Sequence, residues 1–470
     1  MSFNWPNTKL QNVVKLHTGF PFKSSEYSTD GAGYPLLRGD NIVQGFFRWE
    51  DVKRWPISNL TSKHNSYFLE EGDIVLAMDR PWIEAGLKFA QISQSDLPCL
   101  LVQRVSCIRA SMQVEQNFLR YLIASYSFVE YIKQVQTGTA VPHISGKQIL
   151  DFEFKLPPYS IQKNIGSILR SLDDKILHNK KINQTLEQMA QALFKSWFVD
   201  FEPVKAKIAV LEAGGSQEDA TLAAMTAISG KDADALVVFE REHPEYYAEL
   251  KTTAELFPSA MQEGELGATP TGWKLGCIGD ISHRIRTKVG STSAVVLSAI
   301  ASGDLVPSDE HFTKQVYSKS IEKYILVEQW SFAYNPSRIN IGSIGLNVRN
   351  VNGAVSPVYV VFKTEQEYKW YVEILTKTTY FKKNVNILAS GSVRQSLSYD
   401  DLSSIPLCIP DVSIVNVFNE KYEVYLTFIE QYRNQNNTLI SIRDTLLPKL
   451  LSGEITLPEA EQAISEAENV

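Results

Sequence analysis

The chain has 470 residues, too many for one hydrophobic core, so we expect two to four domains. Its hydrophobic content of 44% is ordinary for a soluble globular protein, and no apolar run reaches the ~18 residues of a membrane-spanning helix. The net charge is −7, and the excess of acidic side chains lies in the tails and in residues 205–269. Residues 205–269 alone carry 5 basic and 12 acidic side chains. The charge of the rest of the chain permits a nucleic-acid-binding face without establishing one.

The beginning of the chain lacks the basic and apolar regions of a signal peptide. The four cysteines are scattered, and none forms a C-x-x-C pair. We therefore expect a cytoplasmic protein whose cysteines are reduced and buried.

Residues 1–157 are predicted to form a mixed α+β domain, because short apolar or alternating runs are separated by turns rich in glycine and proline. The predicted strands are 13–18, 34–37, 66–77 and 101–109, and a helix follows at about 115–134.

Residues 158–203 are predicted to form a long helix. After Pro157-Pro158, mostly apolar residues recur at alternating spacings of four and three. This pattern is typical of a helix that packs one narrow seam against another helix. Asn179 and Asn183 fill the two middle positions of this seam. The other seam residues are Ile165, Leu169, Leu172, Ile176, Leu186, Leu193 and Trp197.

Residues 204–269 are predicted to form a helical insert and a linker, with helices interrupted at Gly214-Gly215 and Gly230. A second mixed domain is expected at 270–410. Its predicted strands are 276–283, 294–300, 324–333 and 355–362, and its helix is 365–384.

A second long helix is predicted at 411–455, followed by an acidic tail at 456–470 that is either a short helix or disordered. Its seam residues are Phe418, Tyr422, Tyr425, Ile429, Asn436, Leu439, Leu446 and Leu450. Only Arg443 fits this seam badly. Since a single helix cannot bury its own seam, we expect the two helices to pack as an antiparallel coiled coil. Asn183 and Asn436 either face each other and fix the register or lie on a solvated edge.

The two halves form an internal repeat. A shift of 253 residues places Thr137–Val141 on Ser390–Arg394 and Leu156-Pro157 on Ile409-Pro410, and a shift of 256 places Ala77 on Ala333. The repeat predicts two copies of one domain-plus-helix unit, related by a pseudo-two-fold axis.

The candidate catalytic motifs are all incomplete. Gly138…Gly146-Lys147-Gln148 has the wrong spacing for a phosphate-binding loop and lacks its Ser or Thr. Asn335-Pro336-Ser337-Arg338 lacks the second proline and the aromatic residue of an amino-methyltransferase loop. Glu153-Phe154-Lys155 resembles the end of a nuclease motif but fits an edge strand better. The histidines show no metal-ligand spacing, so we expect a non-catalytic protein that has no metal and no cofactor of its own.

The loops of both mixed domains contain side chains suited to DNA. Arginine and asparagine can read guanine and adenine in the major groove, whereas lysine mostly holds phosphate. A surface arginine is more often merely solvated, so each single candidate is weak and only the set as a whole favours DNA binding. The candidates are Arg38, Asn41, Lys53, Arg54, Lys63, Arg80, Lys88 and Arg104 in the first domain, and Arg284, Arg286, Lys288, Lys314, Arg338, Asn340, Arg349 and Arg394 in the second.

Several segments together resemble the specificity subunits of Type I restriction-modification systems, and the resemblance extends over nearly the whole chain. They are Leu156-Pro157-Pro158-Tyr159 running into Leu172-Asp173-Asp174-Lys175-Ile176, Leu193-Phe194 with Trp197–Pro203, Glu265-Leu266-Gly267 with Gly272-Trp273, Leu446–Ile455, and the loop Thr137–Ser145.

The resemblance implies two target-recognition domains, 1–157 and 270–410, that each read one half of a split double-stranded DNA sequence. It implies that the paired helices act as a spacer on which two methyltransferase subunits dock, and that restriction (translocase-nuclease) subunits join this core. AdoMet, ATP and magnesium would then belong to the partner subunits. The rival interpretations are a stand-alone DNA methyltransferase or nuclease, and a coiled-coil adaptor that binds proteins only.

Overall fold

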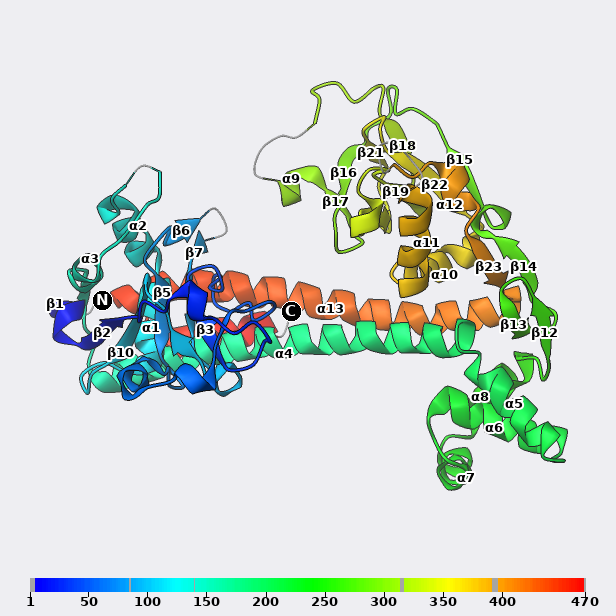
Figure 1. Ribbon diagram of the computed structural model, residues 1–470, viewed down its shortest axis with the longest axis horizontal. Helices are drawn as coiled ribbons and strands as arrows, with labels where there is room; N and C mark the ends of the chain where they lie inside the picture. Colours follow the sequence, from blue (N-terminus) through cyan, green and yellow to red (C-terminus); the bar gives the residue numbers. More distant parts are fainter. Residues whose placement is uncertain (1–4, 84–85, 139, 313–316, 391–395, 469–470) are drawn as a thin grey trace. The chain divides into compact units, whose positions relative to one another are not determined.

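The computed structural model describes residues 5–83, 86–138, 140–312, 317–390 and 396–468. The chain divides into two compact units (Figure 1). Unit 1 consists of residues 1–181 and 431–470, and unit 2 of residues 182–430. Each unit therefore contains one mixed domain together with part of each of two long helices, α4 (Tyr159–Phe198) and α13 (Val412–Ser452).

The centre of unit 1 is an antiparallel sheet of order β2-β10-β5-β8, formed by β2 (Val14–Thr18), β10 (Val105–Ala110), β5 (Ile74–Ala77) and β8 (Phe89–Gln91). Side chains alternate across a strand, so β5 divides its four buried residues between two cores. Ile74 and Leu76 belong to the larger core, which also contains Phe118 and Phe128 from the two helices that follow β10. Val75 and Ala77 face a smaller core on the other side of the sheet.

The remaining elements of unit 1 surround this sheet. They are the helices α1 (Gln116–Ala124), α2 (Tyr126–Val135), α3 (Gly146–Leu150) and α14 (Leu457–Glu468), the strands β3 (Tyr34–Leu37), β4 (Arg54–Trp55) and β9 (Leu100–Leu101) of a three-stranded sheet, and the pairs β1 (Asn7–Lys9) with β11 (Glu153–Lys155) and β6 (Trp82–Ile83) with β7 (Gly86–Leu87).

Unit 2 contains a sheet of the same order and the same antiparallel pairing, formed by β15 (Ser282–Ile285), β22 (Val360–Thr364), β19 (Ser331–Tyr334) and β20 (Ile344–Leu346). A second sheet has the order β17-β16-β21-β18, from β17 (Leu305–Pro307), β16 (Val295–Ala299), β21 (Gly353–Val355) and β18 (Ile325–Val327). The other elements of its mixed domain are β14 (Lys274–Cys277) paired with β23 (Pro406–Ile409), and the helices α9 (Ser308–His311), α10 (Lys369–Leu375), α11 (Thr379–Ser390) and α12 (Tyr399–Ser403).

Several predicted elements were too long, because a continuous apolar run can contain a turn. The predicted strand 324–333 is two strands in different sheets, separated by a turn in which Trp330 has φ of 63°. Three other predicted strands also span two strands each: 355–362 covers parts of β21 and β22, 101–109 parts of β9 and β10, and 276–283 parts of β14 and β15. The predicted strand 66–77 includes the end of a 3-10 turn that precedes β5. The predicted helix 115–134 breaks at Ser125, whose hydroxyl accepts from the Phe128 N–H and caps α2. The helix predicted at 365–384 is interrupted after α10, and α11 continues it to Ser390.

In unit 1, α4 and α13 pack with opposite chain directions. Ile165 and Leu169 share a core with Leu446 and Leu450, and further along α4, Leu172 and Ile176 pack on Leu439. Arg443, which fits the apolar seam badly, donates from Nη1 to Asp173 Oδ1 at 2.9 Å. The charged seam position is therefore ion-paired.

Asn179 is the polar partner of Asn436 in unit 1. Its Nδ2 donates to Asn436 Oδ1 at 3.0 Å and to Gln435 Oε1 at 2.7 Å. The predicted pairing of Asn183 with Asn436 is therefore wrong. Because the two helices run in opposite directions, residues further along α4 contact residues correspondingly earlier in α13. This register places Asn179 opposite Asn436, and Asn183 lies one helical turn further along α4.

In unit 2, the same two helices again contact each other with opposite directions. Asn183 Nδ2 donates to the Ile429 carbonyl at 3.3 Å, and Phe194 and Trp197 pack on Phe418 in the main core of this unit, which also buries Tyr422. Leu186, Leu193 and Tyr425 are half-buried.

We predict that exchanging both Asn179 and Asn436 for leucine raises the free energy of unfolding, since apolar pairs of similar size avoid the cost of burying two amides. Asn179→Leu alone should lower it by about 1–3 kcal/mol, because Asn436 Oδ1 then loses its buried donor. Denaturant titration of the single and double variants measures both effects. A double variant that is no more stable than the single variant contradicts the assignment of this pair.

The predicted insert is a helical body with its own small core. It contains α5 (Glu202–Glu212), α6 (Gln217–Ser229), α7 (Ala233–Glu242) and α8 (Pro244–Leu256), which Figure 1 shows gathered together. Met225, Leu236 and Leu250 are buried between them. The prediction missed a hairpin, β12 (Met261–Gly264) with β13 (Gly267–Pro270), because its strands contain few of the β-branched residues that mark a strand.

The acidic tail folds as α14, which buries Ala460 in the main core of unit 1. The cysteines are free thiols, and three of them are buried. Burial raises the pKa of Cys99 to about 12 and that of Cys408 to about 11, which keeps both thiols protonated. None of the helices in the described ranges is long and apolar enough to cross a membrane.

Candidate nucleic-acid interface

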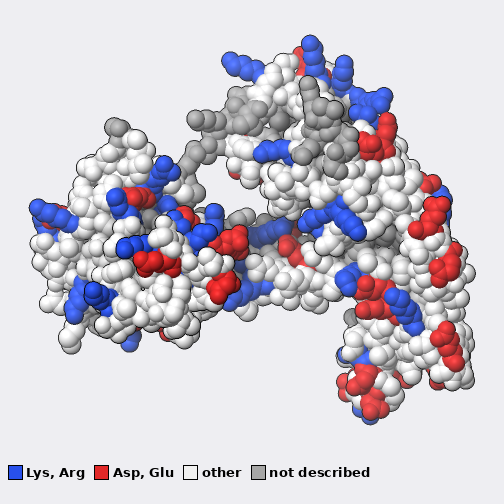
Figure 2. Space-filling model, in the orientation of Figure 1, with Lys and Arg blue, Asp and Glu red and all other residues white. Residues whose placement is uncertain are grey.

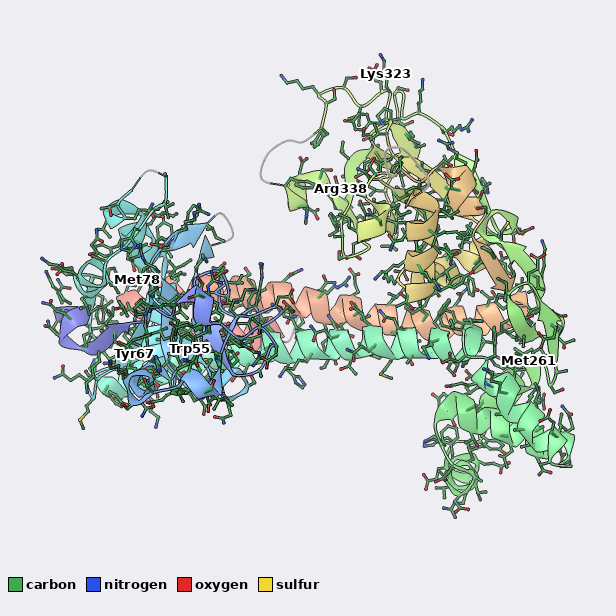
Figure 3. The ribbon with its side chains drawn as sticks, in the orientation of Figure 1. Trp55, Tyr67, Met78, Met261, Lys323 and Arg338 are labelled. Atoms are coloured by element: carbon green, nitrogen blue, oxygen red, sulfur yellow. The ribbon has the colours of Figure 1, made fainter. Side chains whose placement is uncertain are left out.

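In unit 1, three loops meet beyond one end of the central sheet, in the region where Figure 3 labels Met78. The Met78 N–H, just after β5, donates to the carbonyl of Arg104, which precedes β10, at 2.8 Å. From the loop after α2, the Ile144 N–H donates to the Met78 carbonyl at 2.9 Å, and that loop's Pro142 carbonyl accepts from the Arg80 N–H at 2.6 Å. We call this junction the first tip; it comprises residues 78–80, 103–104, 136–138 and 140–145.

Two arginines of the first tip have strained backbones. Arg80 has φ of 46° and Arg104 φ of 69°, in the left-handed region that residues with a Cβ rarely adopt. Each costs about 1–3 kcal/mol, and such residues persist where the surrounding structure fixes them, often at functional sites. Both side chains are exposed. The tip thus presents two cations on a fixed backbone.

Asp79 lies between two basic groups of the first tip. Its Oδ1 accepts from Arg104 Nη1 at 3.1 Å and from His143 Nδ1 at 2.6 Å. The three side chains come from three different loops, so this carboxylate connects the whole tip. Asp79 was not among the residues predicted from the sequence, and His143 was included only as part of the loop that resembles the family's.

Two of the other first-domain candidates have structural roles. Asn41 Oδ1 accepts from the Arg38 N–H at 3.1 Å, and its Nδ2 donates to the Arg48 carbonyl at 3.2 Å. Arg54, on β4, donates from Nη1 to the Gly33 carbonyl at 2.9 Å. These contacts hold loops in place and occupy groups that could otherwise contact DNA.

Three lysines complete the first-domain set. Lys53 and Lys63 are exposed, and neither belongs to the loops of the first tip. Lys88 is half-buried, and burial lowers the pKa of its ammonium group, with the nearby Asp40 carboxylate opposing that shift. Asp40 also pairs with Arg38 at 3.4 Å.

In unit 2, basic side chains gather at the edge where Figure 3 labels Lys323, and Figure 2 shows them as a patch. Arg284, Arg286 and Lys288 are exposed along and beyond β15. Backbone pairing of Lys288 with Ile325 places the 319–323 loop beside them. Lys319 and Lys323 in that loop were not among the predicted residues, although both are exposed lysines in a loop between two predicted strands, as the predicted candidates are.

The remaining second-domain candidates lie in other loops. Arg338 and Asn340 are exposed in the turn after β19. Arg349 pairs with Glu310 at 3.4 Å. Lys314 and Arg394 lie outside the described residues.

Arg80 and Arg338 occupy equivalent positions in the two units. The Met78 carbonyl accepts from Ile144, and the Pro336 carbonyl accepts in the same way from Leu397, the repeat counterpart of Ile144. This aligns Met78 with Pro336 and Arg80 with Arg338, a shift of 258 residues. The shift of 256 inferred for this segment was therefore two residues short, because loops of unequal length precede the strands.

The incomplete catalytic motifs have structural roles. Glu153–Lys155 is β11, which pairs with β1 and buries only Phe154, as predicted for an edge strand. Gly146 begins α3, and Gln148 caps this helix by accepting from the Ser145 N–H at 2.8 Å. Within the described ranges, no group of three or more His, Cys, Asp or Glu side chains is placed to hold a metal ion.

Comparison with known proteins identifies the family. Residues 3–188 match the family model described as the Type I restriction modification DNA specificity domain. The Type I restriction enzyme HindI specificity subunit of Haemophilus influenzae is 34% identical over 363 residues, which are 72% of this chain and 77% of that protein. The chain belongs to the specificity-subunit family of Type I restriction-modification systems. It is therefore a non-catalytic component with a DNA sequence-specificity role, as its motifs indicated.

Two further comparisons agree with this specificity-subunit assignment. The EcoAI specificity subunit of Escherichia coli is 38% identical over 185 residues, 39% of this chain and 31% of that protein. The crystal structure of the Type I restriction-modification S subunit from M. genitalium has the same fold, with a TM-score of 0.51, 12% identity and coverage of 96% of both chains.

Proposed function

We propose that this specificity subunit reads a split DNA target, with residues 1–157 recognising one half-site and residues 270–410 the other. The observation that carries the proposal is the repeated sheet, β2-β10-β5-β8 and β15-β22-β19-β20, with exposed arginines at its loops in each unit. A common scaffold with different loops suits two different sequences, because base edges are read by side chains and the scaffold sets their approach.

The spacer in this proposal is an antiparallel coiled coil of α4 and α13, flanked by two pseudo-symmetric domains. The helix contacts within each unit support it. Helices of 40 and 41 residues are each about 60 Å long, and half-sites on one face of a duplex lie about 34 Å apart. Helix length would then set the number of unread base pairs.

The proposed partners are two methyltransferase subunits and restriction (translocase-nuclease) subunits, which would carry AdoMet, ATP and magnesium. Exposed apolar side chains on the long helices support docking of a protein partner, since isolated helices normally expose polar residues there. They include Leu177 and Met189 on α4 and Val424 and Phe428 on α13. A cytoplasmic location follows from the proposed action on cellular DNA.

Lengthening both helices tests the spacer. Seven residues added to α4 after Asn183, and seven at the matching turn of α13, extend the pair by about 10 Å, close to three base pairs. We expect sequencing of DNA methylated by the complex with its methyltransferase to show unchanged half-sites and about three more unread positions. A matched control adds seven residues at the turn between α5 and α6, which leaves both long helices at their original length. Altered half-sites with unchanged spacing would contradict the proposal.

A further inference from the structure

The first tip contains an arginine that is both exposed and held in place. The side chain of Arg104 is 62% exposed, yet its Nη1 is bonded to both oxygens of Asp79, at 3.1 and 3.3 Å. Among the described residues, nothing accepts a hydrogen bond from its Nε or Nη2. A guanidinium held at one nitrogen has lost much of the rotamer freedom that binding would otherwise remove.

Asp79 is itself fixed from the other side. Its Oδ1 also accepts from His143 Nδ1, and backbone hydrogen bonds link Met78 to Arg104 and to Ile144. The backbone of Arg104, at φ of 69°, points the side chain in a direction that an ordinary strand start does not allow. Carboxylate, imidazole and strained backbone therefore all determine where the free guanidinium edge lies.

The neighbouring Arg80 provides a contrast. It is also exposed and also has positive φ, but its contact with the rest of the tip is a hydrogen bond from its backbone N–H to the Pro142 carbonyl. Among the described residues no carboxylate pairs with Arg80, and such a cation suits a phosphate, which can be approached from many directions. A preorganised guanidinium suits a base, because the bidentate contact to guanine O6 and N7 demands a fixed plane.

We propose that Arg104 reads a guanine in the first half-site through its free guanidinium edge, that Asp79 is the positioning residue, and that Arg80 contacts phosphate. This inference rests on the proposed function. The second domain does not repeat the device, since Ser337 stands where the first has Asp79 and Ser396 where it has His143. The guanine contact is therefore a property of one half-site.

The test uses the full-length chain co-expressed with its methyltransferase, with sequencing of the methylated DNA and duplex binding by the complex. Arg104→Gly removes the side chain, and glycine tolerates the positive φ. We expect one G·C position of one half-site to become degenerate, with discrimination there falling about 5- to 150-fold, while the other half-site is unchanged. Asp79→Asn should relax the same position to a smaller extent.

Arg80→Gly is the matched control, because it removes the same charge from the same backbone conformation. It should weaken binding of all sequences alike and reduce the slope of log affinity against log salt by about one, without changing the motif. Melting temperatures of all four variants, including Arg104→Lys, show whether each complex is folded. Arg104→Lys keeps the charge, so the complex should still bind DNA but should no longer discriminate at the G·C position. This variant tests the assignment of Arg104 even if Arg104→Gly unfolds.

The outcomes separate the inference from the function on which it rests. If Arg104→Gly and Arg104→Lys methylate the original motif with unchanged stringency, or if Arg80→Gly relaxes that position instead, the assignment of Arg104 is wrong while split-target reading stands. A wild-type complex that methylates no defined bipartite motif overturns both.

Discussion

Replacing Trp197 with alanine is expected to lower the free energy of unfolding of unit 2 by about 3–5 kcal/mol. Trp197 is fully buried near the end of α4, where its ring contacts Phe257 with centroids 5.1 Å apart and Phe418 at 6.3 Å. The same core includes Phe362 of the central sheet. The variant leaves a cavity at the point where the helix pair joins the mixed domain, and a core of aromatic rings cannot easily collapse into it.

Trp197→Phe is the informative control. The indole Nε1 is buried with no hydrogen-bond partner among the described residues, so phenylalanine removes a cost while it retains most of the ring. We expect a loss below about 1.5 kcal/mol, as for other conservative core exchanges. Denaturant unfolding followed by circular dichroism measures both variants. Equal losses for alanine and phenylalanine would show that ring packing is not what stabilises this junction.

Removing the carboxylate of Asp73 should destabilise unit 1 by about 3 kcal/mol, at the lower end of the range for breaking a buried ion pair. Asp73 is 3% exposed; its Oδ1 accepts from Arg109 Nε at 2.5 Å, and its Oδ2 accepts from Arg109 Nη2 at 2.8 Å and from the Glu70 N–H at 2.8 Å. Asp73→Ala leaves the cation without this partner inside the sheet. The loss is limited because Arg109 is partly exposed and also pairs with Glu70 at 3.0 Å.

A double-mutant cycle distinguishes the ion pair from the packing around it. Arg109→Met retains much of the aliphatic stem, and in combination with Asp73→Ala it should recover part of the lost stability, because no buried charge is then left unpaired and Glu70 is exposed to water. A double variant whose loss equals the sum of the two single losses would mean that the pair is not coupled. Equilibrium denaturation of the four proteins gives the coupling energy.

The sequence was most informative about the long helices. Periodic seams such as Leu169, Leu172 and Ile176 depend only on local spacing, so they could be read without knowledge of any partner. The pairing of Asn179 with Asn436 could not be predicted in this way, because it depends on the register between two helices that are more than 200 residues apart in the sequence. Strand ends were lost for a related reason, since a turn that uses Trp330 at positive φ has no sequence signature.

Prediction of the candidate interface shows the same division. Arg80 and Arg104 could be selected as exposed basic residues of loops, but so could Arg54, whose guanidinium is bonded to a backbone carbonyl. What distinguishes Arg104 is a carboxylate 25 residues away in the chain and a left-handed backbone that arginine seldom adopts. Neither can be recognised before the three loops are brought together.

The way the chain is divided between the two units affects how the protein is made. Unit 2 is one continuous segment, whereas unit 1 needs residues 431–470, including Leu446, Leu450 and Ala460 of its core. During synthesis, unit 2 can therefore fold before the chain is complete, while the N-terminal domain, made first, must wait for its last helices. We expect the first mixed domain to remain protease-sensitive on the ribosome until residues 431–470 have been made, and a chain that stops before residue 431 to contain an unfinished first domain and a folded second one.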